Sequence, residues 1–454
     1  MDAHNPLTRR QFVSSTSRAL AGAILVPTLG TTMASATLAA KSRMAMVGTG
    51  IRGIRMWGKD LIQEYPDLFE FVGLCDSNPG RAAFARSYMG VTCPTFTDFE
   101  EMLRKARPDT VIVTTVDATH HTFIAKALAM GCNVITEKPM TTDEMKLKEI
   151  LDAQKKSDRK LVVTFNYRYT PHRARIKELL MQDRIGRITS VDFHWYLDTD
   201  HGASYFRRWH GIRKHSGSLL LHKATHHFDL LNWWIDSDPE RVHAFGALEF
   251  YGRNNAFRHT HCRTCPHTAK CRFYFDMTKD PLLMSLYADQ EKYDGYIRDA
   301  CLWREEIDIF DKMAVQIKYA NAVQVSYSLT TYSPYEGYRI AFNGTKGRLE
   351  AWIHENQPWP LEGYDELRIT DMFGKTELVR IQQEPGGHGG GDRRMKERIF
   401  RGPGQADPLG QAAGVRDGAM SIMIGIAARQ SIDSGMPVDI RNLSELIPQV
   451  KRPT

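Results

Sequence analysis

The sequence lacks a hydrophobic run long enough to cross a membrane. The apolar stretch at residues 19–29 is shorter than the roughly 20 residues that a span needs. A strong excess of either charge is also missing, because a formal net charge of +7 is small for 454 residues. This balance gives no reason to expect nucleic acid or a membrane surface as a partner. Internal repeats and low-complexity tracts are absent, and 42% hydrophobic with 25% charged residues is ordinary for a globular protein.

The N-terminus has the pattern of an export signal. Arg9 and Arg10 precede the short apolar stretch, and small residues follow at 34–36. This order predicts a cleaved twin-arginine signal peptide over residues 1–40, recognised by the twin-arginine export machinery, and a periplasmic or otherwise exported protein. An ordinary basic tail is the alternative. About 415 residues would remain, which is enough for two domains.

A glycine-rich turn follows the first apolar run of the remaining chain. Gly48, Gly50 and Gly53 form a Gly-x-Gly-x-x-Gly pattern, and residues 51–65 can be helical. The order strand, glycine turn, helix suits the pyrophosphate of a dinucleotide, because the start of the helix offers free N–H groups. A second apolar run ends in Asp76, about 20 residues after the last glycine, where a carboxylate is expected to bind ribose hydroxyls.

The same features indicate which cofactor is bound. Asp76 favours NAD, because a carboxylate repels the 2′-phosphate of NADP, although Arg81 leaves NADP possible. Free nicotinamide dinucleotide is scarce outside the cytoplasm, and the twin-arginine route carries folded proteins. We therefore predict a tightly bound cofactor that is regenerated in place.

Apolar runs that alternate with helical segments predict an α/β fold beginning with a doubly wound parallel sheet. Further strands are expected at residues 109–115 and 133–136, with a helix at 120–130 between them. Ligands of such sheets bind at the carboxyl ends of the strands. Lys138, just beyond one such end, is well placed to act as an acid or to polarise a carbonyl. The predicted cofactor contacts on these elements are Gly48, Gly50, Ile51, Arg52, Gly53, Asp76, Ser77, Thr115, His120, Glu137 and Lys138.

Several motifs together resemble the Gfo/Idh/MocA oxidoreductase family. They are the glycine fingerprint, Asp76, the segment from His120 to Gly131, Glu137-Lys138-Pro139, residues 163–171 and residues 186–188. The resemblance implies a Rossmann domain over residues 41–165 and a larger domain over residues 166–454, built on an open, mostly antiparallel sheet. It also implies a nicotinamide cofactor, a sugar, glycoside or polyol substrate, and a homo-oligomer. By the same resemblance, Lys138 is the catalytic or substrate-orienting lysine, and Asn166 lies near the nicotinamide ribose.

A histidine-rich segment follows at residues 217–234. If it is helical, His222, His226 and Asp229 share one face. His226 can then be a general base, the three side chains can bind a metal, or all three can be structural. The family pattern has an aspartate where His222 stands, which puts the usual carboxylate–histidine relay in question. We assign catalysis to Lys138, His226 and His222, with no metal, and predict substrate contacts from Tyr167, Arg168, Lys223, Asp229 and His388.

An insert at residues 251–303 carries four of the seven cysteines. Cys262 and Cys265 form a Cys-x-x-Cys pair, and Cys271 and Cys301 follow. Such a set can close a structural zinc site or form disulfides. A catalytic thiol is the least favoured interpretation, because nothing nearby in the sequence activates one.

His388 stands in a run of glycines at residues 386–391. This loop resembles the Gly-Gly-His-Gly-Gly element of NAD-dependent glycosidases, which generally lack the lysine of Glu-Lys-Pro. Lys138 therefore favours an NAD(P)-dependent dehydrogenase that acts on a CH–OH group of a carbohydrate. The alternatives are a glycosidase or lyase that works by transient oxidation and elimination with retained NAD, and a nucleotide-binding protein without turnover.

Overall fold

The computed structural model describes residues 41–453. The predicted twin-arginine signal at residues 1–40 lies outside the described residues. Within the described part of the chain, no helix combines the length and the hydrophobicity that crossing a bilayer requires.

Six parallel strands form the first sheet, in the order β3-β2-β1-β4-β5-β6. They are β1 (Ser42–Val47), β2 (Phe69–Cys75), β3 (Thr95–Phe96), β4 (Thr110–Val113), β5 (Asn133–Thr136) and β6 (Leu161–Val163). This is the strand order of a Rossmann fold, as predicted. It places β1 beside β4, and the crevice where the strand order reverses is where such folds bind dinucleotides.

Helices connect these strands. They are a π-helical turn (Gly53–Lys59) that runs into α1 (Asp60–Glu64), then α2 (Pro79–Met89), α3 (Phe99–Ala106), α4 (His120–Ala129) and α5 (Glu144–Lys155). The N-termini of α2, α3 and α5 are capped by side chains. Asn78, Asp98 and Asp143 each accept a hydrogen bond from a backbone N–H of the first turn.

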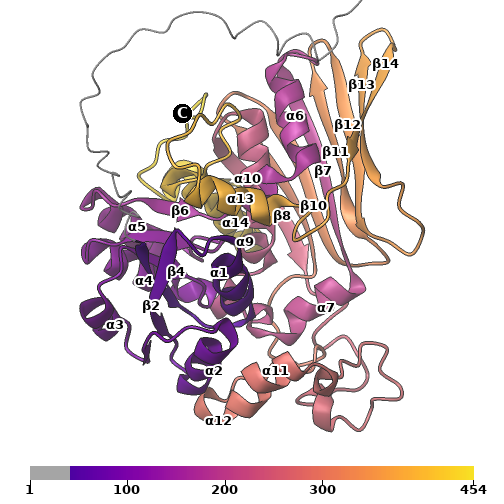
Figure 1. Cartoon of the computed structure of the whole chain (residues 1–454). Coiled ribbons are helices and arrows are strands. Elements are labelled where there is room, and N and C mark those ends of the chain that lie inside the picture. The colour runs from indigo at the N-terminus through magenta and orange to yellow at the C-terminus, as the bar shows by residue number, and fades with distance from the viewer. Residues whose placement is uncertain (1–40, 454) are drawn as a thin grey trace, which may run out of the picture. The chain divides into compact units, whose positions relative to one another are not determined.

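Nine strands form the second sheet, in the order β14-β13-β12-β11-β7-β10-β9-β8-β15 (Figure 1). They are β7 (Ile188–Asp198), β8 (Pro239–Ala247), β9 (Lys312–Tyr319), β10 (Gln324–Ser333), β11 (Glu336–Gly344), β12 (Gly347–Asn356), β13 (Tyr364–Asp371), β14 (Thr376–Gln382) and β15 (Val438–Asp439). Among the described strands, β7 and β10 pair in parallel and the other neighbours in this sheet are antiparallel. The prediction of a mostly antiparallel second sheet is confirmed.

One face of the second sheet is covered by helices. Side chains of β9 and β10 alternate between buried and more exposed, as expected when only one face of an antiparallel sheet is packed. The covering helices include α6 (Pro171–Met181), α10 (Ala224–Ile235) and α14 (Val415–Ser434) (Figure 1). The remaining helices are α7 (Thr199–Arg207), α8 (Arg213–Ser216), α9 (Leu219–His222), α11 (Pro281–Leu286), α12 (Glu291–Asp294) and α13 (Gly391–Phe400).

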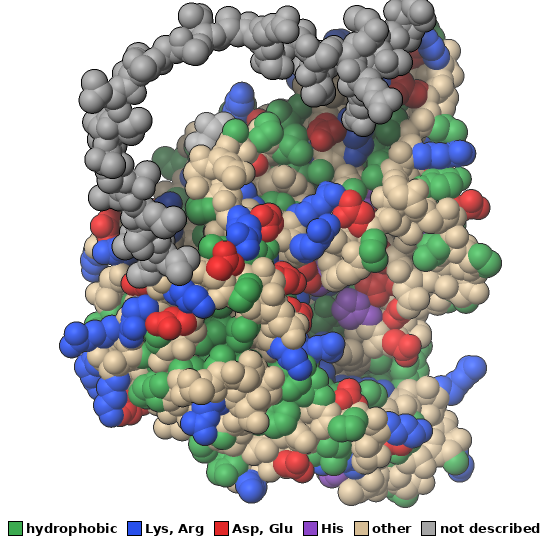
Figure 2. All heavy atoms as spheres, in the orientation of Figure 1, with side chains coloured by type: hydrophobic (Ala, Val, Ile, Leu, Met, Phe, Trp, Pro, Cys, Tyr) green, Lys and Arg blue, Asp and Glu red, His purple; other side chains and the backbone are tan. Residues whose placement is uncertain are grey.

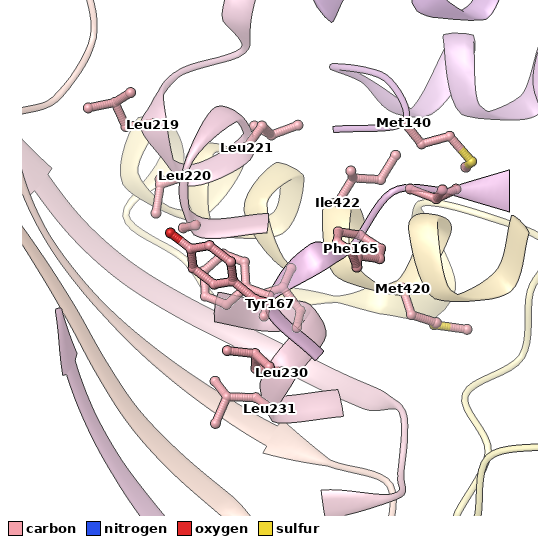
Figure 3. Packing of buried hydrophobic residues seen from close by; sticks show 14 of the residues in the cluster. Met140, Phe165, Tyr167, Leu219, Leu220, Leu221, Leu230, Leu231, Met420 and Ile422 are labelled. Carbon is pink, nitrogen blue, oxygen red and sulfur yellow. The ribbon is translucent and has the colours of Figure 1, made fainter. Parts of the chain in front are cut away.

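A continuous apolar core joins the two sheets. Met140 and Phe165, which lie beside the first sheet, belong to the same cluster as Leu220 on α9 and Ile422 on α14 (Figure 3). All twelve residues of α10 are buried. The helix layer is therefore packed from both sides and fixes the two domains against each other.

On the surface, charged side chains of both signs are interspersed. Figure 2 shows Lys and Arg next to Asp and Glu over the visible face.

A buried ion pair links the start of the second domain to its central helix. Arg168 donates to both carboxylate oxygens of Asp229, from Nε at 2.8 Å and from Nη2 at 2.5 Å, and Nη2 also donates to Asp417 at 2.8 Å. The side chains of Arg168 and Asp229 are each 1% exposed. The sequence predicts both as substrate contacts, and the structure corrects this: they satisfy each other inside the core and do not line the cavity described below.

We expect Arg168→Met to lower the free energy of unfolding by about 3–5 kcal/mol, because it leaves buried carboxylates without their partner. Lys105→Met, which removes an exposed i,i+4 pair with Glu101, is the control and should cost about 0.3–0.5 kcal/mol. Urea denaturation followed by circular dichroism measures both. A variant at position 168 as stable as the control would contradict a structural role for the pair.

Candidate functional site

A cavity of about 720 Å³ lies at the carboxyl ends of the first sheet and extends to the second domain. Most of the predicted site residues line it. They are Gly48, Gly50, Ile51, Arg52, Asp76, Ser77, Thr115, His120, Glu137, Lys138, Asn166, Tyr167, His222, Lys223, His226 and His388. Gly53, Arg168 and Asp229 do not line it.

The glycine-rich turn forms one wall of the cavity. Gly48 has a positive φ of 90°, and a Cβ there would lie 2.6 Å from the backbone of Thr114 and Thr115, which directly follow the neighbouring strand β4. A Cβ on Gly53 would lie 2.6 Å from the carbonyl oxygen of Gly48. Only glycine fits at these two positions, so the helix can start directly at the end of β1 with its N–H groups at the cavity.

Asp76 is fixed at the end of β2. Its Oδ2 accepts hydrogen bonds from the backbone N–H of Thr49 at 2.8 Å and from the Thr49 hydroxyl at 3.0 Å, and its Oδ1 accepts from the N–H of Asn78 at 2.9 Å. Arg81 reaches the same carboxylate at 3.4 Å and forms an ion pair with Asp294. The carboxylate is thus held beside the glycine turn, where a ribose is expected to lie.

Glu137 anchors the start of the first helix. Its Oε1 accepts from Arg52 Nε and from Trp57 Nε1, both at 2.8 Å. Burial raises the pKa of Glu137, but the Arg52 charge and the Trp57 hydrogen bond outweigh it and bring the pKa below its ordinary value. The ionised Glu137 therefore fixes the glycine turn relative to Lys138, its neighbour in the chain.

Lys138 reaches across the cavity to the second domain. Its Nζ donates to the carbonyl oxygen of His222 at 2.7 Å. Burial lowers the pKa of Lys138 to about 8, although the nearby Asp117 and Glu137 carboxylates act in the opposite direction. The amine is consequently close to the point where it can both hold and release a proton near neutral pH.

His222 has a carboxylate partner that the sequence pattern does not reveal. Its Nδ1 lies 2.6 Å from Oδ2 of Asp117, a buried residue in the loop after β4. The carboxylate missing from the helix is thus supplied by the other domain. Of the three residues predicted to share a face, His222 at the end of α9 and His226 on α10 both line the cavity, whereas Asp229 is paired with Arg168 in the core. Because Asp229 is bound to Arg168, the three side chains do not converge on a common point where a metal could bind.

His226 faces the cavity from the first turn of α10. Its ring stacks on Tyr167 with 4.1 Å between ring centroids and 12° between planes. Burial, with the Lys138 charge nearby, lowers the pKa of His226 well below its usual value, so the ring is neutral. Its Nδ1 is buried and has no hydrogen-bond partner among residues 41–453. A buried imidazole nitrogen without a partner is a place where a ligand hydroxyl can bind.

Lys223 and its neighbours form a polar wall next to His226. Lys223 Nζ donates to the Tyr167 hydroxyl at 2.9 Å and lies 3.9 Å from Glu336, a residue of β11. His201 on α7 approaches Glu336 at 2.8 Å and the Tyr205 hydroxyl at 2.9 Å. Glu336 and His201 were missed from the sequence, because their distance along the chain hides their proximity.

The glycine-rich loop at residues 386–391 brings His388 to the same cavity. His388 Nδ1 lies 3.0 Å from Asp392 and 2.9 Å from Asn166 Nδ2. Burial raises the pKa of Asp392, but the His388 hydrogen bond and the Arg52 charge hold it well below its usual range. Asn166 Oδ1 has no hydrogen-bond partner within the described chain, so this amide oxygen can accept a hydrogen bond from a ligand.

Part of the cysteine-bearing insert covers the cavity. The segment from Tyr287 to Arg298, which we call the strap, supplies Tyr287, Asp294, Tyr296 and Arg298 to the lining. The Ile51 N–H donates to the Tyr287 hydroxyl at 2.9 Å, at the start of the first helix. On the outer side, Asn78 Nδ2 donates to the carbonyl oxygen of Gln290 at 2.9 Å. The strap was missed because its aromatic residues are equally typical of a core.

Two arginines in the cavity have no carboxylate partner. Within residues 41–453, no acidic side chain forms an ion pair with Arg208 or Arg298. Burial lowers the pKa of Arg208 to about 10, and the nearby Arg298 charge adds to this. Two like charges close together, beside a helix N-terminus, fit an anionic group such as a pyrophosphate.

Comparison with known proteins agrees with the two-domain fold. Two Gfo/Idh/MocA family models match the chain. The model described as "Oxidoreductase family, NAD-binding Rossmann fold" matches residues 42–165, and the model described as "Oxidoreductase family, C-terminal alpha/beta domain" matches residues 177–440. Bacillus subtilis YteT is 38% identical over 421 residues, which cover 88% of this chain and 98% of YteT.

Solved structures share the fold. A levoglucosan dehydrogenase in complex with NADH and levoglucosan has a TM-score of 0.63 and 18% identity, over 88% of this chain and 100% of its own. The Bordetella pertussis WlbA dehydrogenase, in complex with NADH and UDP-GlcNAcA, has a TM-score of 0.60 and 19% identity, over 88% of this chain and 99% of its own.

We expect Arg298→Gln to weaken dinucleotide binding by about 10- to 100-fold, the loss of one hydrogen bond or charge contact to a phosphate. Isothermal titration of the nucleotide-free protein with NAD measures the change. Arg253→Gln, on the exposed surface of the same insert, is the control and should leave the affinity unchanged. Equal affinities for the two variants would show that the strap arginine does not contact the nucleotide.

Proposed function

We propose that this chain, which belongs to the Gfo/Idh/MocA family of oxidoreductases, oxidises a CH–OH group of a sugar, glycoside or polyol with a retained NAD. One observation carries the proposal. Lys138 and His226 line the same cavity as the glycine turn, so proton-accepting groups and the nucleotide site share one enclosure.

The residues present fit a nicotinamide dinucleotide. Gly48 and Gly53 let the backbone approach the phosphates, Arg298 offers a charge, and Asp76 accepts from ribose hydroxyls. When bound, the nicotinamide ring supplies the acceptor for the hydride that leaves the substrate carbon. Asn166 Oδ1 is free to hold the ribose at the reactive end. Tyr287 and Arg298 lie over the site, and this cover supports a cofactor that stays bound between turnovers.

The substrate proton has two candidate acceptors. Lys138 is the stronger one, because burial places its pKa near 8 and the neutral amine can take the hydroxyl proton as the carbon is oxidised. His226, neutral and without a partner at Nδ1, accepts or relays the same proton. His222 with Asp117 holds the backbone carbonyl that positions Lys138 and thus acts through it.

The opposite wall offers hydrogen bonds to other hydroxyls. Tyr167, Lys223 and His388 line the cavity around His226. The solved neighbours named above are complexes with NADH and a sugar or sugar nucleotide, which supports a carbohydrate substrate. With a retained cofactor, the same groups return a proton when a second carbonyl compound is reduced, so the cycle closes without release of the nucleotide.

His388 favours one alternative. It lies on the glycine-rich loop, is held by Asp392 and faces the cavity, which would suit transient oxidation followed by elimination of a glycosidic leaving group. That path returns the electrons within one turnover and yields a cleaved glycoside in place of a ketone. The presence of Lys138 favours the dehydrogenase.

For the wild type we expect the oxidation rate to rise with pH through about 8 and then level off, because only the neutral Lys138 amine accepts the proton. Lys138→Met should lose about 10²–10⁴-fold in kcat and lose this pH step. The exposed Lys160→Met is the control with unchanged kinetics. Product analysis of the same reactions by mass spectrometry separates the two functions. Retained glycoside cleavage without ketone in Lys138→Met would overturn the dehydrogenase proposal.

Export by the twin-arginine route is part of the same proposal, since it explains why the cofactor should be retained. Replacing Arg9 and Arg10 together with lysine should leave the protein in the cytoplasm, as judged by cell fractionation and immunoblotting. A periplasmic protein after this double substitution would contradict the proposed route.

A further inference from the structure

Four cysteines of the insert line one small cavity. They are Cys262, Cys265, Cys271 and Cys301, which are distant from the catalytic groups in the sequence but meet beside Arg207. All seven cysteines of the described chain are unpaired, so none of the four is committed to a disulfide. We propose that these four thiols bind one zinc ion, and that the ion anchors the strap over the nucleotide site.

Backbone pairing brings the distant cysteines together. His261 and Ala300 form an isolated antiparallel bridge. Cys262 N–H donates to the carbonyl oxygen of Asp299, and Cys301 N–H donates to that of Thr260, both at 2.9 Å. The bridge places Cys262 opposite Asp299, and residues opposite each other on antiparallel segments share a face. Asp299 and Cys301 are two residues apart and also share a face, so Cys262 and Cys301 point to the same side of the bridge.

The other two cysteines come from tight turns. Cys265 N–H donates to the carbonyl oxygen of Cys262 at 3.1 Å and closes a 3₁₀ turn. Because such a turn has three residues, Cys262 and Cys265 lie on the same side of it. Cys271 N–H donates to the carbonyl oxygen of His267 at 3.0 Å. Two cysteines from one turn, one from the next turn and one from the bridge form the Cys₄ set of a structural zinc site.

The size of the cavity favours a single ion. Its volume of about 20 Å³ is close to what one water molecule requires. An iron–sulfur cluster has several metal and sulfide atoms and needs far more room. Among residues 41–453, no three His, Cys, Asp or Glu side chains already stand at ligating positions. Zinc binding therefore requires the thiol side chains to turn inward to a sulfur–metal distance of about 2.3 Å.

Two hydrogen-bond donors already reach the sulfurs of these cysteines. Arg207 Nη1 donates to Cys262 Sγ at 3.2 Å, and the His267 N–H donates to Cys265 Sγ at 3.4 Å. Hydrogen bonds to ligand sulfur from a guanidinium and a backbone N–H are outer-shell contacts that stabilise metal-bound thiolate. Arg207, which lines the cavity, would offset part of the net negative charge of a zinc ion with four thiolates. Each thiol that binds releases its proton.

The site lies at the base of the strap. Asp299 is bound to Arg263, next to Cys262, and Cys301 follows two residues later, so the end of the strap is held to the cysteine turns. Arg263 also pairs with Glu291 within the strap. Loss of the ion would loosen this base and, through it, the cover formed by Tyr287 and Arg298. This consequence rests on the proposed function, whereas the metal site itself does not.

The test starts with the metal content of the purified full chain. Inductively coupled plasma mass spectrometry on protein prepared without chelators or metal-affinity resins should give about one zinc per chain. Cys265→Ser and Cys301→Ser should each lose most of it. Cys93→Ser, a buried cysteine outside the insert, is the matched control and should keep it. If the insert variants fold poorly, the wild type still decides: an organomercurial that titrates its thiols should release zinc to a chromogenic chelator in proportion.

Three results would overturn the proposal. They are iron with inorganic sulfide, fewer than the seven thiols of the sequence in denatured and chelated protein, and seven free thiols without zinc uptake after reconstitution. The effect on the strap is measured separately as the dissociation rate of bound NAD, which should rise at least about tenfold in Cys301→Ser. An unchanged dissociation rate with lost zinc would refute the anchoring while leaving the site. A protein that never binds NAD would refute the proposed function while leaving the site intact.

Discussion

The hydrogen bond from Lys138 Nζ to the carbonyl oxygen of His222, 2.7 Å long, joins the two domains at the reactive end of the cavity. This hydrogen bond requires the end of α9 to lie close to the segment that follows β5. The apolar core between the two sheets holds these two segments together. Burial beside this core lowers the pKa values of Lys138 and His226. The core that holds the domains together thus also shifts the pKa values of the two groups that we propose as proton acceptors.

Around this contact, charge is distributed in two ways. Arg168, Asp229 and Asp417 satisfy one another inside the protein and contribute stability without facing the cavity. His226 Nδ1 and Asn166 Oδ1 have no hydrogen-bond partner among residues 41–453, and Arg208 and Arg298 line the cavity without an ion pair to an acidic side chain of these residues. This difference separates residues that hold the fold from residues that await a ligand. By this criterion Arg168 and Asp229, although near the site in the sequence pattern, have a structural role.

Local patterns in the sequence identified much of the fold and part of the site. Some residues can be interpreted from their immediate neighbours in the sequence. Examples are Gly48, a glycine that approaches another backbone, and Lys138, a lysine just after a strand end. Asp117 and Glu336 could not be found this way, because each meets its partner through contacts between residues more than a hundred positions apart. Helical spacing also misled at Asp229, since spacing alone does not tell which side of a helix faces the core.

The central claim is that one enclosure holds both a retained nicotinamide cofactor and the groups that take the substrate proton. The most direct test is the absorbance spectrum of the purified, undialysed protein before and after addition of a panel of sugars, glycosides and polyols. The account predicts a bound nucleotide and, with at least one member of the panel, the appearance of the reduced nicotinamide band in the same sample. A protein that carries no nucleotide, or one whose bound nucleotide responds to no member of the panel, would contradict it.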